Sequence, residues 1–152
     1  MICDIYVETT YKGPRRQTGL LAFVIVARYE NQPDHTDKLY CHQKAPITMQ
    51  EALLRCTAAA LDRAANMARL RSVKEFNIIS TNPWVGNMFN NLDTWKANGW
   101  KNSKGEEVKY KDYWQMIDKA GEGRTIRWIN EEERGSGLDS YRDWLLRTIR
   151  MK

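Results

Sequence analysis

Lysines and tryptophans alternate in one short stretch of the chain, between residues 95 and 111. Five lysines fall within sixteen residues there, against Glu106 and Glu107: Lys96, Lys101, Lys104, Lys109 and Lys111. Ammonium groups in such a cluster bind phosphates and position a nucleic acid without reading its sequence. Trp95 and Trp100 lie among them. The pattern predicts a phosphate-binding surface; the alternative is solvated lysines over packed tryptophans, and we expect packing for Trp95 and Trp114.

The overall composition agrees with a globular chain that meets an anionic partner. The net charge is +5 and the pI is about 9.2, which favours partners such as nucleic acid. A hydrophobic content of 42% with 28% charged residues excludes a disordered chain. The longest apolar run, residues 20–27, has eight residues and is far shorter than the roughly 20 that cross a bilayer. The start of the chain lacks the features of a signal peptide, so we expect a cytoplasmic protein without membrane contact.

Cysteine and histidine do not form a recognisable metal or disulfide pattern. The three cysteines, Cys3, Cys41 and Cys56, are odd in number and show no CxxC spacing, which argues against a disulfide framework and a zinc site. The two histidines, His35 and His42, are expected to be surface or sheet residues.

The first third of the chain predicts three strands. β-Branched and aromatic residues fill residues 2–8, the apolar run continues to residue 28, and residues 39–41 suit a third strand. Turn residues separate them at 12–16 and 31–34. Sequential strands with short turns predict an antiparallel meander.

From about residue 48, apolar residues recur at helical spacing. An alanine-rich segment at about 48–70 predicts a long helix, and residues 76–80 predict a short strand. Asn82-Pro83 predicts a helix start, with a helix continuing to Leu92. Another helix is expected to end near Gly121, before a strand at 125–129 and a last amphipathic helix at 138–151. The order β-β-β-α-β-α-α-β-α predicts a mixed sheet covered by helices.

The lysine and tryptophan stretch is similar to that of one family. Trp95-Lys96-Ala97-Asn98-Gly99-Trp100-Lys101, then Val108-Lys109, Asp112 and Trp114-Gln115, resemble the W-K-x-x-G-W-K and V-K-x-x-D-x-W runs of type 1 ribonucleases H. The resemblance implies an α/β, ribonuclease H-like fold: a five-stranded mixed sheet, with a three-strand antiparallel meander plus parallel strands, flanked by helices. It also implies one domain over residues 1–152, with a basic protrusion at about 94–112.

The resemblance further implies a metal-dependent site. The family cleaves the RNA strand of RNA/DNA hybrids with two divalent metals about 4 Å apart, held by four carboxylates. Glu8, Glu51 and Asp143 stand at three of these positions, and Glu8 replaces an aspartate. At the fourth position, after residue 79, Thr81 or Asn82 replaces an aspartate with a neutral side chain. The implied cofactor is Mg²⁺ or Mn²⁺, weakly bound.

Each of these residues also has a structural interpretation. Thr48 and Glu51 have the spacing of a capping box. Asn82 before Pro83 is typical of a helix N-cap, which we favour over a ligand role. Asp143 is an ordinary acidic residue for the first turns of a helix.

The loop before the last helix also departs from the family. Glu131, Glu132 and Glu133 stand where the family often has a glycine-histidine stretch. They could supply a replacement ligand, but a solvated acidic loop is the interpretation we favour, and it would repel phosphates.

Further contacts to the hybrid are implied by position. Lys12, Arg15 and Arg16 replace the glycine-rich turn that the family lays near the RNA strand. Thr48 stands near a family contact to the minor groove, where 2′-hydroxyls distinguish RNA from DNA. The implied nucleic-acid contacts are Lys12, Arg15, Arg16, Thr48, Lys96, Trp100, Lys101, Lys104 and Lys109.

Three hypotheses follow. The first is a monomeric ribonuclease H homologue that binds RNA/DNA hybrids and cleaves the RNA strand with weakened activity. The second is a nucleic-acid-binding or adaptor module of the same fold without catalysis. The third is an unrelated interaction domain whose basic face meets an acidic protein. Metal-dependent cleavage separates the first two, and salt-sensitive hybrid binding separates both from the third.

Overall fold

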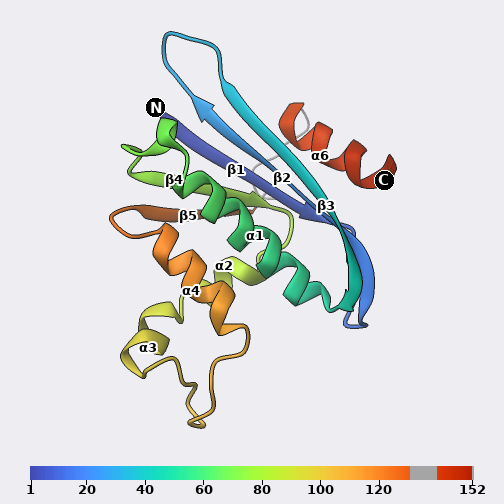
Figure 1. The fold of residues 1–152 in the computed structure, drawn as a ribbon, viewed down its shortest axis with the longest axis vertical. Helices are drawn as coiled ribbons and strands as arrows, with labels where there is room; N and C mark the ends of the chain where they lie inside the picture. Colours follow the sequence, from blue (N-terminus) through green and yellow to red (C-terminus); the bar gives the residue numbers. More distant parts are fainter. Residues whose placement is uncertain (131–139, 152) are drawn as a thin grey trace.

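The computed structural model describes residues 1–130 and 140–151. In these residues, five strands form one sheet in the order β3-β2-β1-β4-β5 (Figure 1). The strands are β1 (Ile2–Thr9), β2 (Gln17–Arg28), β3 (His35–Ile47), β4 (Glu75–Ser80) and β5 (Thr125–Asn130). β1, β2 and β3 pair antiparallel, whereas β4 pairs parallel with β1 and β5 parallel with β4. The predicted mixed sheet with an antiparallel meander is confirmed.

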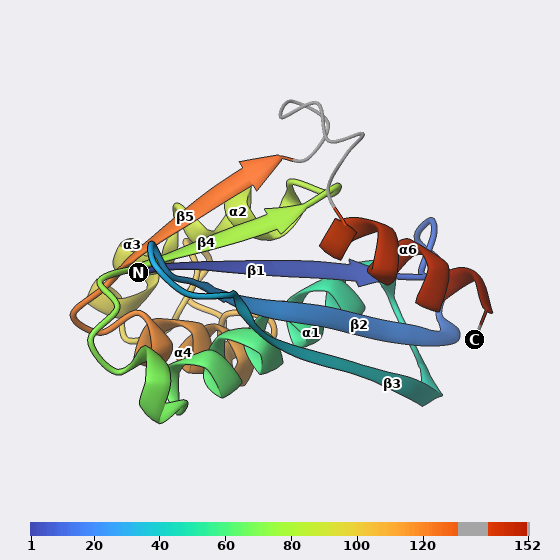
Figure 2. The ribbon, with the colours of Figure 1, turned by 90° about the horizontal axis from the view of Figure 1, so that it is seen from above.

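Helices cover both faces of this sheet. The helices are α1 (Met49–Ala65), α2 (Trp84–Phe89), α3 (Leu92–Ala97), α4 (Lys111–Ala120) and α6 (Ser140–Met151), with a short 3₁₀ helix, η1 (Ala68–Leu70). α1 packs on β1, β2 and α4, while α6 packs on the opposite face of β1 and β2. Figure 2 shows α6 separated by the sheet from the α1–α4 layer.

The apolar run in β2 is explained by these two layers. Leu21, Phe23 and Ile25 belong to the larger core on the α1 side, and Val24 and Val26 belong to the smaller core beneath α6. Because both faces of β2 are covered, the side chains on both faces are apolar. The strand therefore lacks the apolar–polar alternation of a half-exposed strand.

Two predicted boundaries differ from the structure. β3 has 13 residues, many more than the predicted 39–41, because it is an edge strand whose side chains are largely exposed and therefore polar. The helix predicted to run from Pro83 through Leu92 is two short helices, α2 and α3, with Asn90 and Asn91 between them. The long helix stops at Ala65, where the Asn66 side chain donates to the Asp62 carbonyl at 2.8 Å.

The three thiols are free and differ in environment. Cys3 in β1 and Cys56 in α1 are buried, whereas Cys41 in β3 is exposed. The Cys56 Sγ donates to the carbonyl of Ala22 at 3.4 Å. Burial raises the pKa of Cys56 to about 12. Within the described ranges, no helix combines the length and apolar character needed to span a membrane.

Candidate carboxylate site and nucleic-acid interface

The Glu8 carboxylate lies where the parallel strands β1 and β4 end. Glu8 is the second-last residue of β1, and Thr81 directly follows β4. Because the two strands run parallel, their carboxyl ends meet at one edge of the sheet. The Thr81 hydroxyl lies 3.0 Å and 3.2 Å from the two Glu8 carboxylate oxygens. A neutral donor therefore binds the carboxylate that the family resemblance assigns to a metal.

Asn82 caps the chain reversal after β4. Its Oδ1 accepts from the Trp84 backbone N–H at 2.9 Å, and its own N–H donates to Ser80 Oγ at 3.2 Å. The N-cap of α2 is Pro83, which makes no side-chain cap hydrogen bond, so the N-cap role expected of Asn82 is wrong by one residue; its side chain instead closes the turn that leads into the helix. The side chain is thereby engaged in starting α2, and it carries no charge to offer a cation.

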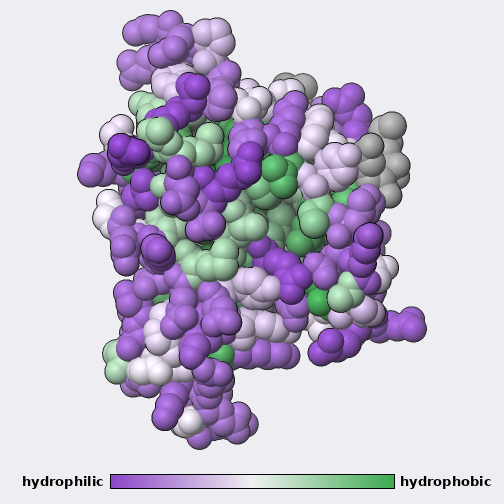
Figure 3. Space-filling model, in the orientation of Figure 1, coloured by the Kyte–Doolittle hydropathy of each residue, from purple (hydrophilic) through white to green (hydrophobic). Residues whose placement is uncertain are grey.

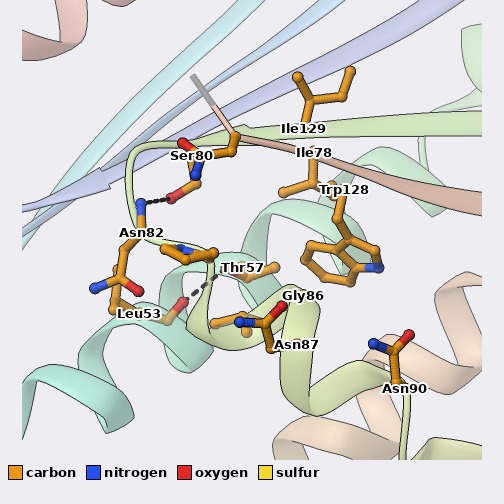
Figure 4. A pocket seen from close by; sticks show the side chains of 13 residues that line it. Leu53, Thr57, Ile78, Ser80, Asn82, Gly86, Asn87, Asn90, Trp128 and Ile129 are labelled. Atoms are coloured by element: carbon orange, nitrogen blue, oxygen red, sulfur yellow. Dashed lines mark hydrogen bonds between the residues drawn. The ribbon is translucent and has the colours of Figure 1, made fainter. Parts of the chain in front are cut away.

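Asn82 also borders a pocket between the ends of β4 and β5 and helix α2 (Figure 4). The pocket has a volume of about 310 Å³, and every described residue that lines it is uncharged. The Trp128 ring packs against Gly86, where a Cβ would lie 2.9 Å from Trp128 Cβ. A glycine is required at this position, because any side chain would push the aromatic wall away.

Glu51 lies in the first turn of α1. Its backbone N–H donates to the Thr48 Oγ1 at 3.2 Å, which confirms Thr48 as the N-cap. The Glu51 carboxylate forms an ion pair with Arg55, one turn further along the helix, at 3.2 Å. We did not anticipate this pair, although the spacing of four residues between Glu51 and Arg55 is a known signal for it.

Asp143 is exposed on α6, one turn from the start of the helix. Tyr6 lies in the core beneath α6, and because side chains alternate along a strand, Glu8 points to the same face. Glu8 and Asp143 therefore share one side of the sheet. Glu51 belongs to α1 on the other side, where its carboxylate contacts Arg55.

A polar network fixes the start of α6 on the sheet. The Tyr141 hydroxyl donates to Asp34 at 2.7 Å, and Arg28 bridges Asp34 and the buried Asp4, with 2.7 Å to Asp4. Burial alone would lower the pKa of Arg28, but its hydrogen bond to Asp4 raises that pKa above the ordinary value. The Arg28 guanidinium also lies 5.1 Å from the Tyr141 ring centre. The helix that carries Asp143 is thus tied to two strands.

The arrangement does not fit a pair of divalent metals. In residues 1–130 and 140–151, no three His, Cys, Asp or Glu side chains are grouped so that they could hold a metal ion. Glu8 is hydrogen-bonded to Thr81, and Glu51 is paired with Arg55. Glu131, Glu132 and Glu133 lie outside the described residues. We therefore derive no metal-dependent step from this geometry.

The first hairpin exposes three cations. Lys12, Arg15 and Arg16 lie in the turn between β1 and β2, and all are exposed. The Gln17 side chain donates to the carbonyls of Lys12 and Arg15 at 2.8 Å and 2.9 Å. The turn is therefore held in one shape while its cationic ends stay in solvent.

The protrusion, residues 94–112, presents a second basic surface. Lys101, Lys104 and Lys109 are exposed, and the Lys109 ammonium lies 5.0 Å from the Tyr110 ring centre. Lys96 is paired with Asp118 at 3.0 Å, and Lys111 is paired with Glu107. Figure 3 shows that the surface of the protrusion is mainly hydrophilic.

The base of the protrusion is rigid. The rings of Trp95 and Trp114 lie 5.4 Å apart, and Trp114 is only 1% exposed, which confirms the packing expected of both. Trp100 and Tyr110 have positive φ values of 63° and 62°, a backbone conformation that ordinary residues adopt only when packing enforces it. The Trp100 carbonyl accepts from Val108 N–H at 2.9 Å and closes the loop.

Comparisons with known proteins agree with the fold and the family. No family model matches the chain. A ribonuclease H of Acetivibrio thermocellus is 39% identical over 128 residues, which are 83% of this chain and 78% of the relative. A ribonuclease H of Francisella tularensis subsp. novicida is 40% identical over 47 residues, 31% of this chain and 26% of the relative.

Solved structures are similar in fold at low identity. LC9-RNase H1, a type 1 ribonuclease H with the type 2 active-site motif, has a TM-score of 0.64 at 17% identity and covers 94% of this chain and 80% of its own. A foamy viral protease-reverse transcriptase in complex with an RNA/DNA hybrid has a TM-score of 0.63 at 16% identity, over 90% of this chain and 18% of its own. With a relative of 39% identity across most of both chains, this chain belongs to the ribonuclease H family.

Proposed function

We propose that the protein binds RNA/DNA hybrids and hydrolyses their RNA strand only slowly. Family membership supports the substrate class. A foamy viral protease-reverse transcriptase and LC11-RNase H1, both solved with an RNA/DNA hybrid, share the fold with TM-scores of 0.63 and 0.52. The basic turn and the protrusion of this chain supply cations for phosphate contacts.

The observation that carries the slow hydrolysis is the set of partners around the carboxylates. Thr81 binds Glu8, Asn82 binds the Trp84 backbone N–H at the start of α2, and Arg55 pairs with Glu51. The family position of an aspartate is thus neutral, and two remaining carboxylates are occupied by internal donors. Losing one metal from such a site costs several kcal/mol of transition-state stabilisation, which is about a thousandfold in rate.

A second candidate function is a hybrid-binding or adaptor module without catalysis. It is favoured by the lack of any three potential metal ligands grouped within the described ranges. The two functions make the same prediction for binding and differ only in whether metal-dependent cleavage can be measured.

The test combines binding and cleavage on one labelled RNA/DNA hybrid, with duplex DNA of the same sequence as the control. We expect saturable hybrid binding and slow cleavage that is faster in Mn²⁺ than in Mg²⁺, because Mg²⁺ demands near-octahedral oxygen ligands. Brisk cleavage in Mg²⁺ would contradict the proposal. Binding with no cleavage in either metal would support the adaptor instead.

A further inference from the structure

Arg55 connects three elements through one guanidinium group. Its Nε donates to the Tyr113 hydroxyl in α4 at 2.6 Å, and its Nη1 donates to Gln43 Oε1 in β3 at 2.5 Å. Its Nη2 reaches the Glu51 carboxylate at 3.2 Å. The guanidinium also lies 5.5 Å from the Tyr113 ring centre. Few alternative positions remain for this side chain.

The hydrogen bonds to Tyr113 and Gln43 distinguish the Arg55–Glu51 ion pair from an ordinary surface ion pair. A helical pair at this spacing contributes only about 0.3–0.5 kcal/mol by itself, so an approaching cation would displace a free arginine easily. Here Gln43 and Tyr113 hold the guanidinium from outside the helix. The Glu51 side chain is 17% exposed, so little solvent screens it from its partner.

We propose that Arg55 is a positioning residue that holds Glu51 as an internal ion pair and keeps divalent cations away from it. The proposal rests on the proposed function, because it assigns part of the slow hydrolysis to Arg55. The guanidinium occupies one lone pair of the Glu51 carboxylate, on Oε2. Its positive charge also repels a second cation: at about 5 Å in water, the repulsion of a divalent ion lowers affinity roughly tenfold.

The chain offers a matched control on the same helix. Arg63 lies two turns beyond Arg55 and forms an ion pair with Asp37 of β3. It therefore resembles Arg55 in residue type, helix and kind of partner. It does not contact Glu51, and its neutralisation changes the net charge of the protein by the same amount.

The test is Mn²⁺ binding to the full chain without substrate, by calorimetry and by the shift of the thermal midpoint. Arg55→Gln removes the charge and keeps a hydrogen-bonding side chain. We expect it to bind Mn²⁺ roughly tenfold more tightly than the unmodified chain. Arg63→Gln should leave Mn²⁺ affinity unchanged, and Arg55→Lys, which keeps the charge but not the three guanidinium contacts, should gain less than Arg55→Gln. In Glu51→Gln/Arg55→Gln the gain should disappear.

Equal Mn²⁺ affinity in Arg55→Gln and the unmodified chain would overturn the proposal, as would a gain that persists in the double variant. If Arg55→Gln does not fold, Tyr113→Phe loosens the guanidinium while keeping its charge, and it must give a smaller gain that depends on Glu51. The proposed function fails on different measurements, namely absent hybrid binding or brisk Mg²⁺-dependent cleavage.

Discussion

The protrusion and the carboxylate region differ in what their charged groups contact. In the protrusion, Lys101 and Lys104 extend into solvent from a rigid tryptophan base. Glu8 near the end of β1 is bound by Thr81, and Glu51 in the first turn of α1 is bound by Arg55. Lys101 and Lys104 stay available for a partner, whereas Glu8 and Glu51 already have partners within the chain.

This difference indicates that binding and hydrolysis can be separated in this fold. Phosphate binding needs only cations on a stable surface, and many arrangements provide that. Metal-dependent hydrolysis needs several carboxylates directed at the same point. A neutral residue at one carboxylate position and an ion pair at another therefore affect the two activities very unequally.

The largest expected effect comes from restoring charge at the strand ends. Asn82→Asp combined with Glu8→Asp should raise the rate of hybrid cleavage about a thousandfold, because a second metal regains charged ligands. An aspartate carboxylate accepts from the Trp84 backbone N–H as the Asn82 amide does, so the start of α2 should be kept. The measurement is cleavage of a labelled hybrid in Mg²⁺ and Mn²⁺.

Asn87→Asp is the matched control for that restoration. Asn87 lies on α2 and lines the same pocket as Asn82. It receives the same charge outside the four carboxylate positions that the family resemblance implies. If Asn87→Asp raises the rate as much as the Asn82 and Glu8 pair, added charge alone is the cause, and the site assignment is wrong.

The second effect concerns the salt dependence of binding by the unmodified chain. Raising salt from about 50 mM to 200 mM should weaken hybrid affinity roughly two hundredfold, because about four or five phosphate contacts release counterions. Affinity measured by fluorescence anisotropy at four salt concentrations gives the slope. If affinity does not depend on salt, lysine and arginine contacts to phosphates do not hold the hybrid, and a protein partner is favoured.

A smaller effect is expected from two exposed lysines. Lys101→Ala with Lys104→Ala should weaken hybrid binding about tenfold at fixed salt, while the thermal midpoint changes little, because neither side chain is packed. Arg71→Ala with Lys74→Ala removes the same charge from exposed positions before β4 and serves as the control. Equal losses in both pairs would mean that net charge, and not the protrusion, determines binding.

The sequence predicted the buried strands and the helix layers well, and it predicted the limits of the exposed edge strand and of the short helices less well. Apolar runs and helical spacing located four of the strands, because those strands are covered on at least one face. The limits of β3 could not be predicted, because an exposed edge strand has no apolar alternation. The division between α2 and α3 falls at Asn90 and Asn91, where the Asn91 side chain donates to the Met88 carbonyl at 3.3 Å. The apolar spacing from Val85 to Leu92 hid this break in the sequence.

The candidate site was predictable in its positions and not in its contacts. The family resemblance indicated Glu8, Glu51, Asp143 and the Thr81–Asn82 pair by number. The Thr81–Glu8 hydrogen bond joins residues 73 positions apart, and only the parallel pairing of β1 with β4 brings them together. The hydrogen bond from Thr81 to the Glu8 carboxylate and the one from the Trp84 backbone to Asn82 required the structure.

The positions of the three thiols make their chemical modification a measure of how often the layer between sheet and helix opens. Cys41 on the outer strand is open to solvent, while Cys3 and Cys56 lie at the contact between β1 and α1 with thiols protonated at neutral pH. A thiolate forms at the two inner sulfurs only when the helix lifts from the sheet. The number of sulfurs modified over time therefore distinguishes molecules that have opened this layer from molecules that have stayed closed.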